Sequence, residues 1–383
     1  MAVGKAEGDT ADAASRACEQ AILGEDTKLL VVFCSQSHDL QLLVDTIAER
    51  SGGVPMIGCS TAGEYALGGP GENGVVVTAL GGEGFSVTTA VAGGASKRLR
   101  ESGAEAAACM SGVVDPERPN RVLMLLTDGL AGDQQEIVRG AYSVTGASVP
   151  LVGGCAGDDL AMKTTYQFHG REVMTDGVVA AAIASDSPFG IGVRHGWRRV
   201  GEPMLVTESA NNRVFTLDER PALQVYLDRL DAPEEARTDE AAFTRFALTH
   251  PLGMSRRSGE EQVRFIGGAD FADGSLSTIA EVPPGALVWS MEGDDESVLA
   301  ATDGACDDAL AGLDGRAPLG VIAFDCIARR GVLGEDGIKT EVEHVAERAG
   351  GAPVAGFYTY GEIARTNGVS GFHNQTLVVL SVS

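Results

Sequence analysis

The sequence predicts an α/β protein with mixed sheets in two domains, built from three internal α-β-α-β-turn-β repeats with a closing strand in at least two of them. A motif that occurs three times predicts this architecture: proline, two apolar residues, glycine, a short variable run, a second glycine and an acid. The copies are Val54 to Glu64, Val149 to Asp159 and Ala352 to Glu362. The segments that flank the three copies also match, which chance similarity in a glycine-rich chain does not explain.

The segments before each motif predict a helix, a strand and a second helix. The first helices are expected at residues 12–23, 96–113 and 296–313. The apolar runs that follow predict buried strands at residues 29–33, 122–126 and 319–324. The second helices are expected at residues 38–50, 133–145 and 336–349. In the first of these, Leu40, Leu43, Val44 and Ile47 recur at helical spacing.

The segments after each motif predict further strands. Apolar runs occupy residues 75–80, 178–183 and 377–382. In the first two copies a short polar turn leads to another run, at residues 85–91 and 189–193, so each is predicted to close as a hairpin. We expect the three repeats to pack with pseudo-symmetry and their acid-bearing turns to lie at one end of the sheets.

Residues 201–284 do not repeat. They predict a strand at 203–207, a helix at 218–230 entered through Pro221, and strands at 262–266, 275–280 and 286–290. We therefore divide the chain into an N-terminal domain, residues 1–200, with two repeats, and a C-terminal domain, residues 201–383, with the new material and the third repeat.

The composition restricts the classes of partner and compartment. The 383 residues include 54 acids and 29 Lys and Arg, a formal charge of −25, and such a surface repels nucleic acid and anionic lipid. No run approaches the roughly 20 apolar residues of a membrane span. The first residues show no apolar signal region, so we expect a cytoplasmic protein. The seven cysteines include no CxxC pair, which argues against a zinc site or a disulfide framework.

The repeated acids are the first candidates for ligand contact. Glu64, Asp158 or Asp159, and Glu362 follow a glycine at the end of a predicted strand, where α/β sheets commonly bind ligands. Such a carboxylate can bind an amine, or it can close the turn through its own backbone, and both interpretations stay open. Cys59 lies beside the first turn, either as a reactive thiol or as a small buried side chain.

Single histidines are candidates for a metal centre. None of them has the spacing of a paired metal site, but one histidine in an apolar pocket is enough to hold a haem iron. His195, His250 and His373 are the candidates, and a structural hydrogen bond is the alternative role for each. The chain has neither a GxxxxGK[ST] phosphate loop nor a nucleophile elbow.

These residues resemble the FIST family, with both its N-terminal and its C-terminal domain. Residues 55–64 and 150–157 are similar to the N-terminal pattern. The C-terminal pattern is matched at residues 206–207, 217–227, 250–252, 356–362 and 372–377. The resemblance extends from about residue 29 to residue 382.

The resemblance implies a sensory module that binds small ligands, with amino acids the usual suggestion. Some members with this layout are haem proteins that sense nitric oxide and regulate a partner histidine kinase. The resemblance therefore implies haem b on one of the three histidines and a separate histidine kinase as partner, and a homodimer is a further expectation.

Two alternatives stay open beside the haem sensor. In a sensor without haem, Glu64 or Glu362 holds the amine of an amino acid and Arg365 holds its carboxylate, with Tyr360 a further candidate contact. The other alternative is an enzyme that uses the acids and Cys59 or Cys155. We expect no catalysis, because no set of nucleophile, base and orienting group can be assembled from the sequence.

Overall fold

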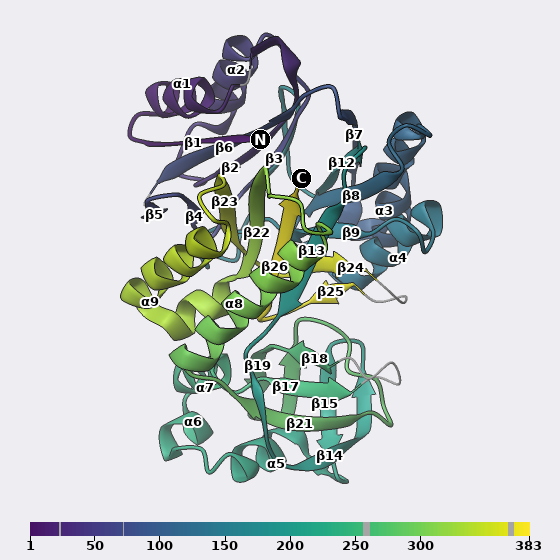
Figure 1. Ribbon diagram of the computed structural model, residues 1–383. Helices are drawn as coiled ribbons and strands as arrows, with labels where there is room; N and C mark the ends of the chain where they lie inside the picture. The colour runs from purple at the N-terminus through teal and green to yellow at the C-terminus, as the bar shows by residue number, and fades with distance from the viewer. Residues whose placement is uncertain (23, 72, 256–260, 367–370) are drawn as a thin grey trace.

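The computed structural model describes residues 1–383 except 23, 72, 256–260 and 367–370. Three α/β units pack together, and residues 198–292 form a second domain inserted between the second and third units. In Figure 1 the three units occupy the upper part of the molecule and the inserted domain lies below them. The prediction of mixed α/β sheets in two domains is confirmed.

The first unit contains two helices and seven strands among its described residues. They are β1 (Ala2–Glu7), α1 (Thr10–Ala21), β2 (Thr27–Cys34), α2 (Leu40–Arg50), β3 (Met56–Ser60), β4 (Glu64–Ala66), β5 (Gly69–Pro70), β6 (Gly74–Gly81) and β7 (Phe85–Gly93).

The second unit repeats this order. Its elements are α3 (Leu99–Ala107), β8 (Asn120–Thr127), α4 (Gln134–Thr145), β9 (Leu151–Cys155), β10 (Gln167–His169), β11 (Glu172–Met174), β12 (Gly177–Ser185) and β13 (Phe189–Arg194). The third unit follows the inserted domain and comprises α8 (Asp295–Ala311), β22 (Gly320–Cys326), α9 (Ile327–Arg348), β23 (Val354–Thr359), β24 (Glu362–Arg365), β25 (Phe372–His373) and β26 (Leu377–Val382).

Three helices of the units, α2, α4 and α8, start at a capping side chain. Asp39 precedes α2, and its side chain accepts the backbone N–H of Leu42. Asp133 precedes α4 and accepts the backbone N–H of Gln135 in the same way. Asp294 forms a capping box with Ser297 at the start of α8. The predicted third-repeat helix at 336–349 is the second part of α9, which begins earlier, at Ile327.

Each unit builds the middle of one six-stranded sheet and lends strands to at least one other sheet. The sheet orders are β1-β6-β2-β3-β10-β11, β25-β24-β9-β8-β12-β7 and β13-β26-β22-β23-β4-β5. The short pairs β10–β11, β24–β25 and β4–β5 all lie in the sheet of another unit. The exchange runs in a cycle through the three units, which confirms the predicted pseudo-symmetry.

The predicted hairpins at residues 85–91 and 189–193 are wrong. β7 pairs with β12 of the second unit, and β13 pairs with β26 of the third unit. The strand that precedes β7, β6, already has both edges occupied by β1 and β2. The chain after the turn therefore completes the neighbouring sheet.

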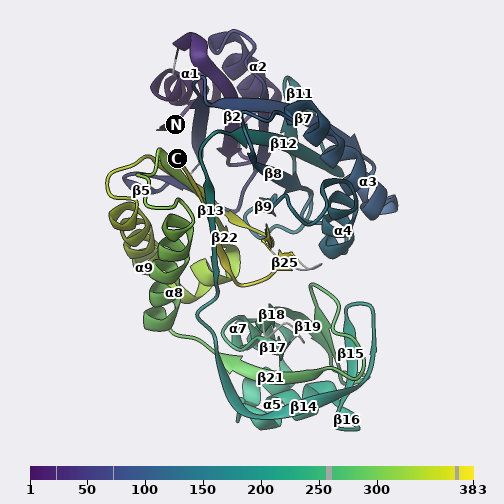
Figure 2. The same ribbon diagram turned by 45° about the vertical axis from the view of Figure 1, so that its right-hand side comes forward.

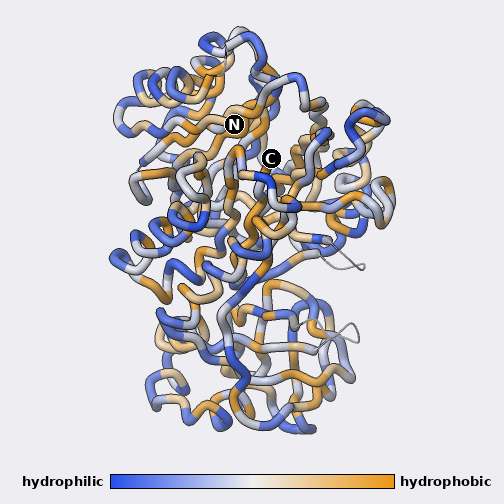
Figure 3. Tube along the Cα trace, in the orientation of Figure 1, coloured by the Kyte–Doolittle hydropathy of each residue, from blue (hydrophilic) through white to orange (hydrophobic). Residues whose placement is uncertain are grey.

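The inner faces of the three sheets share one hydrophobic core. In β2, Leu29, Val31 and Phe33 face this core while the alternate residues face the helices, so both faces of the strand are buried and its sequence is continuously apolar. Phe33 lies 4.5 Å from Phe357 between ring centroids, and Phe324 lies 5.9 Å from the same ring. Figure 3 shows the hydrophobic positions concentrated along these strands.

Two helices cover the outer face of each sheet. Buried residues of α1 and α2 pack against β2, those of α3 and α4 against β8, and those of α8 and α9 against β22. The turned view in Figure 2 shows the pairs α1–α2, α3–α4 and α8–α9 on separate sides of the molecule. The three units thus form one body with the sheets inside and the helices outside.

The inserted domain has its own sheet and its own core. Its sheet follows the order β18-β17-β21-β14-β15-β20-β19, with β16 beside β15. The elements are β14 (Arg198–Ala210), β15 (Arg213–Leu217), β16 (Arg220–Pro221), α5 (Ala222–Arg229), α6 (Glu234–Thr238), α7 (Glu240–Leu248), β17 (Leu252–Ser255), β18 (Glu261–Arg264), β19 (Ile266–Asp270), β20 (Ser275–Thr278) and β21 (Leu287–Glu292).

The inserted domain begins at residue 198, near the predicted boundary, but it ends at residue 292 and the third unit does not lie with it. The third unit pairs strands with the first two units, and residues 198–292 alone form the separate body. Sequence alone groups the third unit with the insertion because the two are adjacent along the chain. Among the described residues, no helix combines the length and the apolar character needed to cross a membrane.

Gly190 in β13 tests how closely α8 packs on its sheet. A Cβ atom at Gly190 would lie 1.7 Å from the carbonyl oxygen of Ala309, so Gly190→Ala must push α8 outward. We expect this variant to lose about 1–3 kcal/mol of unfolding free energy, measured by urea denaturation. Gly93→Ala, in the equivalent strand β7, is the control because nothing lies within 4 Å of its Cβ position. Equal stability of the two variants would contradict the close packing.

Candidate ligand-binding site

The three motif turns meet through a cycle of backbone hydrogen bonds. In each unit, the residue seven positions after the motif proline donates its N–H to a carbonyl five positions after the proline in another unit. The three bonds are Ala62 to Tyr358 at 3.0 Å, Gly157 to Ser60 at 3.0 Å and Tyr360 to Cys155 at 3.2 Å. The prediction that the three turns gather at one place is confirmed.

A side chain at the start of β4, β10 and β24 fixes each turn. Glu64 accepts the N–H of Gly74 at 2.7 Å, Gln167 accepts that of Gly177 at 3.1 Å, and Glu362 accepts that of Thr376 at 3.1 Å. The residues before these three donors are Asn73, Asp176 and Gln375, which all have a positive φ. The side chain at this position therefore holds a backbone N–H that follows much later in the chain, 10 residues after Glu64, 10 after Gln167 and 14 after Glu362.

The acids predicted for the second copy are not equivalent to Glu64 and Glu362. The equivalent residue is Gln167. The residue before it, Tyr166, accepts the N–H of Ser60, just as Gly361, the residue before Glu362, accepts the N–H of Cys155. Residues 158–165 are additional in the second unit. An alignment on Gly157 misses this loop and assigns Asp158 or Asp159 to a place that Gln167, eight residues after Asp159, occupies.

Asp158 holds the additional loop in place. Its buried carboxylate accepts the N–H groups of Met162 at 2.9 Å, Lys163 at 2.7 Å and Thr164 at 3.0 Å, and the hydroxyl of Tyr360. Burial opposes ionisation, but these donors together keep the pKa of Asp158 below its ordinary value. Asp158 and Tyr360, both predicted as ligand contacts, therefore serve to position the loop.

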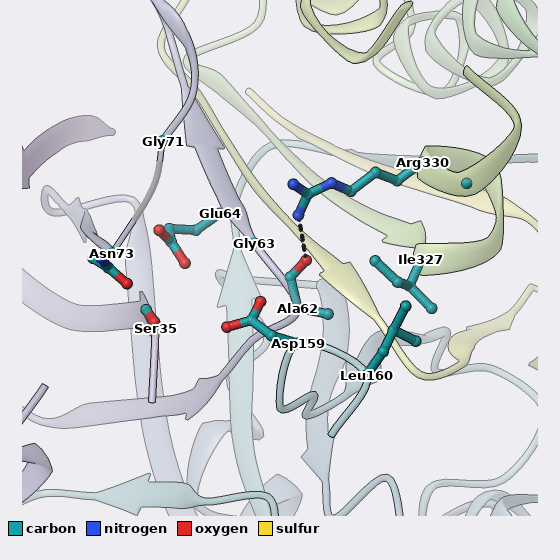
Figure 4. Close-up of a pocket in the computed structure, with 11 residues that line it drawn as sticks. Ser35, Ala62, Gly63, Glu64, Gly71, Asn73, Asp159, Leu160, Ile327 and Arg330 are labelled. Carbon is teal, nitrogen blue, oxygen red and sulfur yellow. Dashed lines mark hydrogen bonds between the residues drawn. The ribbon is translucent and has the colours of Figure 1, made fainter. Parts of the chain in front are cut away.

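A cavity of about 510 Å³ opens between the first turn, the additional loop and the start of α9. All three units contribute to it, and Figure 4 shows the side chains that face it. The lining residues are Ser35, Ala62, Gly63, Glu64, Gly71, Asn73, Asp159, Leu160, Ile327, Arg330 and Gly331. We call this space the Glu64 cavity.

The cavity exists because the three units differ at one position. Ala62, Gly157 and Tyr360 are equivalent in the cycle of hydrogen bonds. In the third turn, the ring of Tyr360 packs against Gly129 of the second unit. At the equivalent place in the first turn, Ala62 has only a methyl group. The symmetry therefore provides three similar positions, and a small residue keeps this one open.

Glu64 is the buried acid of the cavity. Its second carboxylate oxygen accepts the hydroxyl of Thr61 at 2.7 Å. Burial raises the pKa of Glu64 to about 7, although the hydrogen bonds from Thr61 and Gly74 favour ionisation. The carboxyl group therefore changes charge near neutral pH, and a cationic group bound beside it favours the ionised form.

Asp159 and Arg330 supply the other charges. Partial burial of its carboxyl group raises the pKa of Asp159, and the positive charge of Arg330 counteracts this rise. Arg330 donates from Nη1 to the carbonyl of Ala62 at 3.0 Å and forms an ion pair with the exposed Glu335 at 3.2 Å. Figure 4 shows Glu64, Asp159 and Arg330 around the same space. Sequence reasoning missed Arg330, because it lies in a helix far from any motif.

Glu362 and Arg365 line neither of the two cavities described here. Both Glu362 oxygens accept hydrogen bonds, from Thr359 at 2.5 Å and from Thr376. Arg365 is buried, with its guanidinium 3.8 Å from the ring centre of Tyr142 and a hydrogen bond to the carbonyl of Gly146. The structure therefore does not bring the predicted amine and carboxylate partners together at this turn.

The motif cysteines are buried in the sheets. Cys59 lies in β3 and Cys155 in β9, and neither side chain is exposed to solvent. Burial raises the pKa of both thiols well above the ordinary value, which disfavours the thiolate that a nucleophile requires.

Two of the three candidate histidines line a second, larger cavity of about 940 Å³. It lies between β13, α8 and β18 of the inserted domain, and His195 and His373 both face it. Nδ1 of His195 accepts the N–H of Trp197 at 3.0 Å, and Nε2 of His373 lies 2.9 Å from the carbonyl of Ala364. His250 is elsewhere: it stacks on Phe246, with Nδ1 2.8 Å from the carbonyl of the same residue.

Across the part of the chain that the structure describes, no three His, Cys, Asp or Glu side chains are grouped so as to hold a metal ion. This does not address a haem iron, which needs only one protein ligand.

Comparison with known proteins gives two family matches and several relatives. The FIST N domain matches residues 28–220 and the FIST C domain matches residues 222–365. An uncharacterised protein of Methanocaldococcus jannaschii, MJ1623, is 28% identical over 127 residues, which is 31% of this chain and 25% of that protein.

Mycobacterial relatives cover more of the chain. An uncharacterised protein of Mycobacterium bovis, Mb0898c, is 28% identical over 236 residues, 59% of this chain and 58% of the relative. Another, Rv0628c of Mycobacterium tuberculosis, is 27% identical over 234 residues, 59% of each chain. The chain thus spans less than two thirds of the length of these relatives.

Glu362→Gln tests the structural role of the buried acid. Burial raises the pKa of Glu362 to about 8, so the folded state binds this proton more tightly than the unfolded chain does. This proton contributes its full stabilisation of the folded state below pH 4.5, the ordinary pKa. The contribution, on the order of 3–5 kcal/mol of unfolding free energy, is lost as the pH rises to about 8. Glutamine stays neutral, and Gln167 shows that it fits this position.

We therefore expect Glu362→Gln to lose less stability than the wild type between pH 5 and pH 9 in urea denaturation. Glu343→Gln, which removes the same charge from an exposed position, is the control and should follow the wild type. An identical pH dependence in all three proteins would rule out this role.

Proposed function

The chain belongs to the FIST family, and on that premise we propose that it is a small-ligand sensor whose Glu64 cavity binds an α-amino acid. FIST domains are associated with small-ligand sensing in signal transduction. The observation that carries the proposal is the arrangement of opposite charges in one cavity: the carboxylates of Glu64 and Asp159 and the guanidinium of Arg330.

This arrangement matches the two charged groups that every α-amino acid carries. The ammonium group would lie against Glu64 and Asp159, and its positive charge favours the ionised form of Glu64 at neutral pH. The carboxylate would bind Arg330, whose planar guanidinium suits a two-point contact. Arg330 can accept it by releasing Glu335, an exposed partner whose ion pair contributes little stability.

The proposed role is binding rather than catalysis. The candidate nucleophiles Cys59 and Cys155 are buried thiols with raised pKa values and neither lines the cavity. Ligand binding would therefore be read by another protein, and we propose a separate signalling partner such as a histidine kinase.

Haem is the alternative ligand that the family resemblance implies. The larger cavity has the volume for it, but the ring hydrogen bonds of its histidines do not suit an iron ligand. Nδ1 of His195 accepts an N–H, which places the proton on Nε2, and the carbonyl beside Nε2 of His373 leaves only Nδ1 of that ring for iron, whereas haem is usually held through Nε2. His250 has the usual pattern of a ligating histidine, with Nδ1 on a carbonyl, but it lines neither cavity. The amino acid therefore fits the structure better.

A thermal-shift screen of the twenty common amino acids, with haemin added and its absorption followed in parallel, tests the proposal. We expect at least one amino acid to raise the melting temperature, because ligands that bind only the folded state stabilise it. Glu64→Gln should weaken that ligand by roughly 10–100-fold, the loss of one charged hydrogen bond.

Glu362→Gln is the matched control, since it makes the same change at the equivalent position outside the cavity. It should leave the affinity unchanged. Equal loss in both variants, or a nitric-oxide-sensitive Soret band that disappears in His250→Ala while no amino acid binds, would contradict the proposal.

A further inference from the structure

We propose that the Glu64 cavity is coupled to the inserted domain by the first part of α9, residues 327–333, which we call the coupling segment. The segment contacts the cavity on one side and both chain connections to the inserted domain on the other. The identity of the ligand in this inference rests on the proposed function, but the mechanical coupling does not.

The coupling segment is separated from the rest of its helix. Gly334 has φ 65° and ψ −176°, values outside the helical range, so α9 is interrupted after residue 333. Nothing lies within 4 Å of the position that a Cβ atom of Gly334 would take. A left-handed glycine with open space around it can absorb a change in backbone angles, which is what a hinge requires.

One side of the segment forms a wall of the cavity. Ile327, Arg330 and Gly331 all line it. Arg330 also fastens the segment to the first turn through its hydrogen bond to the carbonyl of Ala62, and its guanidinium lies 5.5 Å from the ring centre of Tyr358. A ligand group that binds Arg330 therefore acts directly on the segment.

The opposite side holds the two connections to the inserted domain. Arg329 is fully buried and donates to the carbonyl of His195 at 3.3 Å and to that of Val298 at 3.2 Å. His195 lies just before β14, where the chain enters the inserted domain, and Val298 lies in the first turn of α8, where it has returned. One side chain thus fixes both ends of the insertion.

The segment also touches the inserted domain directly. A Cβ atom at Gly331 would lie 2.5 Å from Cδ2 of Leu248, the last residue of α7. The carbonyl of Leu248 accepts a hydrogen bond from Gln375 at 2.8 Å, so α7 is tied to the turn before β26 as well. Movement of the segment would therefore change the surface on which α7 rests.

The buried polar cluster around Arg329 is incompletely paired. Arg329 forms ion pairs with Asp325 at 2.8 Å and with Glu341. Burial beside Glu341 raises the pKa of Asp325, so the two buried acids can share a proton, whereas the hydroxyls of Tyr65 and Tyr358 have no hydrogen-bond partner among the described residues. Such groups gain from a rearrangement that pairs them, so the cluster can support a second arrangement of the segment.

Coupling follows if the ligand prefers one of two arrangements. A ligand can shift an equilibrium only by its difference in affinity for the two states, and Arg330 provides such a difference because its contacts change on binding. Release of Arg330 from Ala62 would free the segment to turn about Gly334 and carry Arg329 with it. The inserted domain would then change its orientation or its freedom to move.

Hydrogen–deuterium exchange of the full chain, read by mass spectrometry, tests the coupling without a ligand. Arg330→Ala removes the contact between the segment and the first turn. Glu335→Ala removes the other partner of Arg330, from the far side of Gly334, and is the matched control. We expect peptides covering residues 195–200 and 293–298 to exchange at least about fivefold faster in Arg330→Ala, and to be unchanged in Glu335→Ala.

Changes confined to peptides 61–64 and 159–165 in Arg330→Ala would overturn the coupling. If that variant does not fold, Arg330→Met serves in its place, because it keeps much of the aliphatic part of the side chain and still removes the donor to Ala62. The amino-acid screen separates the two ideas. If an amino acid binds but exchange in the two connections does not change in Arg330→Ala, the proposed function stands and the coupling is wrong. If exchange in the connections changes but no amino acid binds, the coupling stands and the proposed function is wrong.

Discussion

The cycle of three backbone hydrogen bonds at the motif turns is the constraint on which the architecture depends. Each bond joins a turn of one unit to a strand end of another, so no turn can be completed within its own unit. The same dependence appears in the sheets, where the short strands after each turn complete the sheet of another unit. Buried backbone N–H and C=O groups must be paired, so the three units are expected to fold as one body and not as three.

The candidate site arises where this symmetry is broken. Tyr360 fills one of the three equivalent positions and Gly157 begins the additional loop at another, while Ala62 leaves space at the third. The additional loop then covers that space with Asp159 and Leu160, and α9 adds Arg330 from the third unit. The shared residues stabilise the turns, and the residues that differ open a cavity beside one of them, so that the shared Glu64 faces it. This division explains why Glu64 and Glu362 make the same hydrogen bonds but only Glu64 faces a cavity.

Local patterns predicted the repeated elements well and their pairing poorly. β2 is continuously apolar because both of its faces are buried, and α2 has apolar residues at helical spacing because one of its faces is buried. Both patterns are properties of the segment itself. The partner of β7 depends on which sheet edge is free, and the sequence of β7 does not contain that information. In the candidate site, Glu64 and Asp159 could be predicted from the sequence because they lie in a motif. Arg330 could not, because it reaches the cavity only through the packing of the third unit on the first. Gln167 was missed because the additional loop shifts it away from the second glycine of the motif.

The decisive measurement is a crystal structure of the chain with the tightest-binding amino acid from the screen. We expect ligand density in the Glu64 cavity, with the amine beside Glu64 and Asp159 and the carboxylate on Arg330. Density in the larger cavity beside His195 and His373, with the Glu64 cavity unchanged, would contradict it. That result would show that the symmetry-breaking at Ala62 does not create the ligand site, and that the space between the third unit and the inserted domain does.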